Sequence, residues 1–222
     1  MDDDQIKRRR FLQTGKIPLW LKVLYTLFVC LLVSYYWTQY GPTNFLWFCD
    51  LALLISLVAL WLESSLLAST QAVSITLPQM LWVADFLVRL VAGVHLIDLT
   101  EYMFDAKIPL FVRGLSLFHG WLPFLLLWLV WRLGYDRRAW WIQSLVAWVV
   151  LVACFVVVSD PLGPAGNVNK IFGPQDDAAQ MWMRRELWLA LLMVVYPVCV
   201  YVPTHLVLSR VFRKPHKLSD RK

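Results

Sequence analysis

Several residues that can do chemistry lie inside apolar stretches of this sequence. Residues 111–131 are long and apolar enough to cross a bilayer, yet their first half carries Arg113, Ser116 and His119. An ionisable side chain at that depth is costly unless it faces protein or water, so it marks a candidate functional site. At about 100° per residue, the three side chains share one broad side of a helix. We therefore predict a polar site on that side, with His119 as its proton-transfer group.

Two other apolar stretches carry ionisable residues. Cys49 and Asp50 are neighbours in the apolar run 44–53, and Asp85 and Arg89 are four residues apart. The latter spacing predicts a structural ion pair along one helix face, the least costly way to hold either charge in lipid. Cys49 alone is typical of a small packing residue, because its thiol needs a basic or cationic neighbour to become a nucleophile. We expect one polar cluster inside the bundle, formed by Asp50, Asp85, Arg89, Arg113 and His119.

The composition indicates that membrane helices position these residues. The chain has 222 residues, of which 59% are hydrophobic and 16% are charged, whereas a soluble domain carries about 25% charged residues. Apolar runs of about 20 residues are typical of polytopic membrane proteins, and a spanning segment satisfies its own backbone as a helix. We predict an all-α bundle with six transmembrane helices, over residues 17–37, 44–64, 75–96, 109–133, 140–158 and 185–208.

The distribution of lysine and arginine predicts how the bundle lies in the membrane. Basic residues gather in the two tails, 1–16 and 209–222, and in the connection between the fourth and fifth predicted helices. Since positive charges stay on the cytoplasmic side, both tails are predicted to be cytoplasmic, with one bundle over 17–208 between them. The chain carries no organelle address, and a plasma (inner) membrane is the expected location.

The charges and cysteines also argue against several classes of partner. The net charge of +6 is concentrated at membrane borders, and no nucleic-acid-binding motif accompanies it. All four cysteines lie inside apolar runs, so no disulfide is expected. No paired Cys/His spacing suggests zinc, and neither a metal nor a cofactor is expected. The expected partners are membrane lipids or a lipid-like acyl substrate, and the sequence does not define an oligomeric state.

A loop rich in glycine and proline follows the fifth predicted helix, over residues 160–174. Such a composition predicts irregular structure. Asn167 and Asn169 offer amide groups that could cover the outer mouth of the bundle. The alternative is an ordinary connector.

Three fragments of the chain resemble a known family of membrane enzymes. They are Tyr40-Gly-x-x-x-Phe-Leu-x-Phe-x-Asp50-Leu, His119-Gly-x-Leu-Pro-Phe124, and Asn167-Val-Asn169 followed by Gly-Pro174. The pattern resembles the androgen-induced family of hydrolases, which cleave fatty acid esters of hydroxy fatty acids, and is similar to the related transmembrane cysteine acyltransferases. Cys49 looks like the cysteine of the acyltransferase branch.

One departure from this pattern decides which nucleophile the resemblance implies. The hydrolase branch has a threonine nucleophile three residues before the aspartate, and Trp47 stands there in this chain. Either Cys49 acts as the nucleophile or the site has lost catalysis. In the enzyme hypothesis His119 takes the thiol proton, and Asp50 or Asp85 orients the imidazole. Candidate substrate-binding residues are Arg89, Arg113, Ser116, Asn167 and Asn169, with an arginine near a head group or the developing oxyanion.

Two other functions remain open at this point. A non-enzymatic membrane binding or interaction protein would use the same charges as a structural network. A small proton-coupled transporter would use Asp50, Asp85 and His119 as a relay. The sequence has no internal repeat of the kind found in many transporters, which argues against the relay.

Overall fold

The computed structural model describes residues 15–94, 96–175 and 178–212, and every regular element within them is helical. The longer helices are α2 (Leu19–Tyr40), α3 (Phe48–Leu62), α4 (Ser65–Ala92), α5 (Leu110–Ser116), α6 (Phe118–Leu133), α7 (Ala139–Val157), α8 (Arg185–Val195) and α9 (Val202–Val211). Short 3-10 turns are η1 (Pro42–Leu46), η2 (Glu101–Met103) and η3 (Val168–Lys170), and η4 (Tyr196–Tyr201) is a π-helical turn. The predicted all-α class is confirmed.

Five segments are long and apolar enough to cross a membrane: 19–40, 65–92, 110–133, 139–157 and 185–211. The chain is thus an integral membrane protein. The second predicted helix is shorter than expected, because Gly41 ends α2 in a left-handed conformation and the 3-10 turn η1 precedes α3. With 15 residues, α3 is about 22 Å long. It packs against α2, α4 and α6 inside the bundle.

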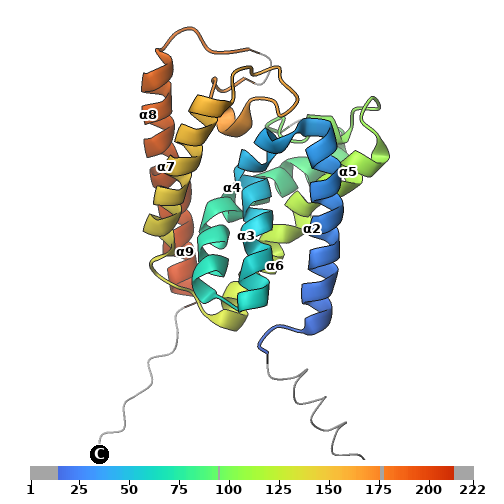
Figure 1. Cartoon of the computed structure of the whole chain (residues 1–222), viewed down its shortest axis with the longest axis vertical. Coiled ribbons are helices and arrows are strands. Elements are labelled where there is room, and N and C mark those ends of the chain that lie inside the picture. Colours follow the sequence, from blue (N-terminus) through green and yellow to red (C-terminus); the bar gives the residue numbers. More distant parts are fainter. Residues whose placement is uncertain (1–14, 95, 176–177, 213–222) are drawn as a thin grey trace, which may run out of the picture.

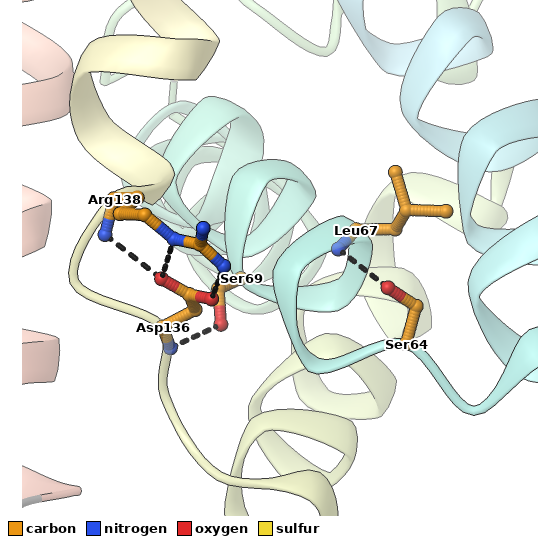
Figure 2. A network of polar contacts seen from close by, with 5 residues as sticks. All are labelled: Ser64, Leu67, Ser69, Asp136 and Arg138. Atoms are coloured by element: carbon orange, nitrogen blue, oxygen red, sulfur yellow. Dashed lines mark hydrogen bonds and ion pairs between the residues drawn. The ribbon is translucent and has the colours of Figure 1, made fainter.

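The third helix begins ten residues earlier than predicted. Residues 69–74 precede the predicted start, yet they are helical, and their serine, threonine and glutamine side chains are buried within the protein. Ser64 caps the start of α4 by accepting a hydrogen bond from the Leu67 N–H at 3.3 Å (Figure 2). Helix α4 then packs against α3, α6 and α7, which makes it the central element of the bundle.

The fourth and sixth predicted helices are interrupted. The fourth divides at Leu117 into α5 and α6, and the sixth passes through η4 between α8 and α9. Pro197 lies in η4 and Pro203 at the start of α9. Proline has no N–H to donate, so a regular α-helix would lack one backbone hydrogen bond at such a position. The wider π turn accommodates the proline and avoids that gap.

The described residues nearest the two tails lie at the same end of the bundle, here called the tail end, and the 93–109 and 158–184 connections lie at the opposite, loop end (Figure 1). Polar contacts join the helices at the tail end. The Asp136 N–H donates to Ser69 Oγ at 2.9 Å, and Arg138 donates to the Asp136 carboxylate (Figure 2).

Glu63 forms a second tail-end contact. It accepts hydrogen bonds from the backbone N–H groups of Lys16 and Ile17 at 2.8 and 3.2 Å and from Lys22 Nζ at 2.8 Å. Partial burial raises the pKa of Glu63, but these hydrogen bonds and the Lys22 charge outweigh it and hold the pKa below its ordinary value of 4.5. The carboxylate thereby ties the start of α2 to the end of α3.

We expect Glu63→Gln to lower the unfolding free energy by about 1–2 kcal/mol at neutral pH, because the charge in three hydrogen bonds is lost. Folding lowers the pKa of Glu63, so its contribution to stability is complete above the ordinary pKa of 4.5. This contribution disappears as the pH falls through the lowered pKa of the folded protein. The difference in melting temperature between wild type and variant should close between about pH 5 and pH 3. Thermal unfolding in detergent micelles measures it.

Glu186→Gln is the matched control, since Glu186 pairs with Arg184 at 3.4 Å at a site where both side chains are exposed. That variant should change stability by less than about 0.5 kcal/mol. A Glu63→Gln effect that stays constant down to pH 3 would contradict the role of its charge.

Candidate functional site

A cavity of about 1340 Å³ lies at the loop end of the bundle. Its walls come from the ends of α2, α3 and α4 at that side, from α5 and α6, and from the 93–109 and 158–184 connections. Pockets for small molecules commonly measure about 300–1,000 Å³, so this one has room for an amphiphile. The predicted site residues that line it are Cys49, Asp50, Arg89, Ser116, His119 and Asn167.

His119 is held in one orientation by its own chain. Its Nδ1 lies 2.8 Å from the Ser116 carbonyl oxygen, which can only accept, so Nδ1 carries the proton and Nε2 is the basic nitrogen. In a regular helix the Gly120 N–H would donate to the Ser116 carbonyl. At the break it donates to the Leu117 carbonyl, which leaves the Ser116 carbonyl available to His119. The ring stacks on Trp82, with centroids 5.5 Å apart. The group that orients the imidazole is thus a backbone carbonyl, where the sequence suggested a carboxylate.

Cys49 and Asp50 lie in the first turn of α3. Asn169 fixes this helix start, because its Oδ1 accepts from the Phe48 N–H at 3.0 Å and its Nδ2 donates to the Leu46 carbonyl at 2.7 Å. Asn169 has a left-handed backbone, with φ of 51°, which asparagine tolerates. It does not line the cavity, and it acts by positioning the residues of α3 that do.

Asp50 is nearly enclosed, with 4% of its surface exposed. Its Oδ2 accepts a hydrogen bond from Asn44 Nδ2 at 3.0 Å, while Oδ1 has no partner among the described residues. Half-buried Cys49 lines the same cavity, although no hydrogen bond joins its thiol to His119 in the described part of the chain. Nucleophile, base and carboxylate candidates therefore share one cavity without forming a preassembled triad.

Asp85 lies outside the cavity lining, and the ion pair predicted with Arg89 is wrong. The Asp85 carboxylate accepts from the backbone N–H groups of Leu96, Ile97 and Thr100 at 3.1, 2.9 and 2.9 Å, and from Thr100 Oγ1 at 2.7 Å. Gly93, with φ of 69°, ends α4 and turns the chain back toward it. Four donors satisfy the charge, so Asp85 holds the 96–100 segment that forms part of the cavity wall.

Arg89 and Arg113 have different environments. The Arg89 guanidinium lies over the Phe104 ring at 4.8 Å and lines the cavity, and its Nη1 has no hydrogen-bond partner among the described residues. Arg113 does not line the cavity. It donates to the Met103 carbonyl at 3.2 Å and thereby holds η2 against α5. Of these two arginines, Arg89 is the one that lines the cavity.

The loop around Asn167 is ordered by that side chain. Its Nδ2 donates to the Gly173 and Gln175 carbonyls at 3.0 and 2.6 Å, and its Oδ1 accepts from the Phe172 N–H at 3.0 Å. Trp47 Nε1 donates to the Ala165 carbonyl at 3.0 Å, which fastens the loop to the start of α3. The 163–167 segment lines the cavity, and the covering role suggested for this loop stays a prediction.

Sequence reasoning missed Trp82 and Tyr102. Trp82 lines the cavity, is 6% exposed, and its Nε1 makes no well-formed hydrogen bond among the described residues, although the Tyr102 hydroxyl interacts with it. The spacing Trp82, Asp85, Arg89 repeats at three and four residues along α4, a signal that could have found it. Tyr102 lines the cavity from η2, and burial raises its pKa, so its hydroxyl stays protonated. Among the described residues, no group of three or more His, Cys, Asp and Glu is arranged to hold a metal ion.

We expect Asp85→Asn to loosen the 96–100 segment, because the amide replaces one accepting oxygen with a donor that faces other N–H groups. Hydrogen exchange of the 96–100 amides should accelerate about tenfold or more, with a stability loss of about 2–3 kcal/mol. Mass spectrometry of peptides from that segment measures it. Asp105→Asn is the control, since the exposed Asp105 carboxylate accepts from the Lys107 N–H within a local turn. Unchanged exchange in Asp85→Asn would contradict the anchoring role.

Comparison of the chain with protein-family models, with curated proteins and with solved structures finds no match.

Proposed function

We propose that this membrane protein is an acyl hydrolase or acyltransferase whose substrate, a lipid-like ester, binds in the loop-end cavity. One observation carries the proposal: Cys49 and His119, from helices far apart in the sequence, line the same cavity, and the imidazole presents its basic Nε2 because Nδ1 is bound to Ser116. With basic tails in the cytoplasm, the cavity would face the outer side of a plasma membrane.

In the proposed reaction, Cys49 attacks the acyl carbonyl carbon and its thiol proton passes to His119 Nε2. A carbon–sulfur bond forms, the carbonyl oxygen becomes an oxyanion, and collapse expels the alcohol, which takes the proton back from His119. Water or a second alcohol then attacks the thioester and releases Cys49. The missing Cys49–His119 hydrogen bond requires the substrate to bring the two groups together, since such contacts often tighten only in the complex.

Trp82 is the proposed oxyanion donor. Its Nε1 is buried and makes no well-formed hydrogen bond among the described residues, and its ring stacks on that of His119, so the donor lies beside the base. An unpaired donor in a water-poor site stabilises charge that develops in the transition state more than it stabilises the neutral ester. Arg89 Nη1, also without a partner, is a second donor on the same helix.

A second candidate is a non-catalytic binding protein for an amphiphile. The absence of a Cys49–His119 hydrogen bond in the described residues favours it, because a thiol without a basic neighbour is a poor nucleophile. Both candidates use the same cavity, and they differ in whether a covalent acyl-cysteine forms.

We expect Cys49→Ala and His119→Gln each to lower the turnover of fatty acyl nitrophenyl esters by about 100-fold or more, because each removes a reacting group. Trp82→Phe keeps the stacked ring and removes the donor, with an expected loss of about 10–100-fold, mostly in kcat. The measurement uses purified protein in detergent micelles, with mass spectrometry of the acyl adduct on Cys49.

Cys199→Ala is the matched control, because Cys199 is exposed on η4 and lies outside the cavity lining. It should retain wild-type turnover. Equal turnover by wild type and Cys49→Ala would rule out the cysteine mechanism. Saturable ester binding without turnover or adduct would favour the binding protein.

A further inference from the structure

The charge of the cavity differs in sign from that of the chain. The chain has a formal net charge of +6. The carboxyl residues that line the cavity are Asp50, Asp98, Glu101 and Asp105, and the basic ones are Arg89 and Lys170. Asp98, Glu101 and Asp105 are exposed, whereas Asp50 is deep. A concave surface with an excess of one charge raises the local concentration of the opposite ion. This lining favours cations.

Asp50 provides separate evidence for a cation site, which does not depend on the exposed residues Asp98, Glu101 and Asp105. It is 4% exposed, and one of its two oxygens lacks any hydrogen-bond partner among the described residues. Its neighbour Asn44 satisfies the other oxygen. Burial favours the neutral acid of Asp50 until a counter-charge arrives, so a bound cation and the ionised carboxylate would stabilise each other. No basic side chain among the described residues pairs with Asp50, so a cationic ligand fits the remaining oxygen.

Aromatic side chains make up much of the remaining wall: Tyr36, Tyr40, Trp47, Trp82, Tyr102 and Phe104. Tyr36 and Tyr40 contact edge to face, with centroids 5.2 Å apart, and Phe104 already carries one cation, the Arg89 guanidinium, at 4.8 Å. Aromatic faces together with a carboxylate are the means by which proteins recognise substituted ammonium groups. Arg89 does not remove this preference, because carboxyl residues outnumber basic ones in the lining, and its Nη1, without a hydrogen-bond partner among the described residues, suits a carbonyl oxygen.

We propose that the cavity selects amphiphiles whose head group carries an ammonium ion, which Asp50 holds against the aromatic wall. This inference rests on the proposed function for the acyl chemistry, since it names the head group of that substrate. Recognition itself does not require Cys49, so binding and turnover can be separated.

The test compares three probes with the same eight-carbon chain: octyltrimethylammonium, octyl glucoside and octyl sulfate. Binding is measured by equilibrium dialysis of the full chain in dodecyl maltoside micelles, which contain no amine, with protein-free micelles subtracted. We expect the ammonium probe to bind at least about tenfold more tightly than the other two. Asp50→Asn should weaken ammonium binding about tenfold or more and leave octyl glucoside unchanged.

Glu186→Gln is the control carboxyl variant, because Glu186 is exposed at the start of α8 and lies outside the cavity lining. It should bind all three probes as wild type does. Cys49→Ala should keep ammonium binding, so that a failure of the acyl chemistry leaves this result intact. Wild-type protein that binds octyl sulfate or octyl glucoside as tightly as the ammonium probe overturns the proposal, whether or not Asp50→Asn folds. Unchanged ammonium binding in a folded Asp50→Asn overturns it as well.

Discussion

A polar group inside a membrane bundle needs a partner within the protein, and this constraint organises the loop end of the molecule. Asp85 is satisfied by N–H groups of the connection that follows its own helix, and Asn169 satisfies the first backbone groups of α3. Both contacts fasten loops to helices, and both thereby shape the cavity wall. Three cavity residues, Asp50, Trp82 and Arg89, keep a buried atom without a well-formed hydrogen bond in the described chain. Those atoms are the ones a ligand would satisfy.

The same constraint explains what the sequence predicts well. Apolar runs of 19 to 28 residues are readable as spanning helices because lipid permits few polar exceptions within them. Cys49, Asp50 and His119 stand out for that reason, and all three line the cavity. The start of α4 was misplaced because buried serine, threonine and glutamine resemble a turn when their protein neighbours are unknown.

Partners of single side chains were harder to predict, because they depend on where the loops return. The spacing of Asp85 and Arg89 favours an ion pair in an isolated helix. The turn at Gly93 instead brings several N–H donors to Asp85, and Arg89 lies over Phe104. Trp82 was overlooked for a different reason: tryptophan is abundant near membrane surfaces, with 13 in this chain. Its spacing from Asp85 and Arg89 along α4 and its place in the cavity lining distinguish it from the others.

The proposed chemistry and the proposed head-group selectivity impose a joint requirement on the substrate. Asp50 and Cys49 are adjacent in the first turn of α3, and their side chains are separated by about 100° around the helix. In a substrate whose ammonium ion is held by Asp50, only a few bonds can therefore separate that ion from the carbonyl carbon that Cys49 attacks. Esters far down an acyl chain would not meet this geometry. A short acylated amino alcohol, with its acyl chain directed between the helices, satisfies both residues at once.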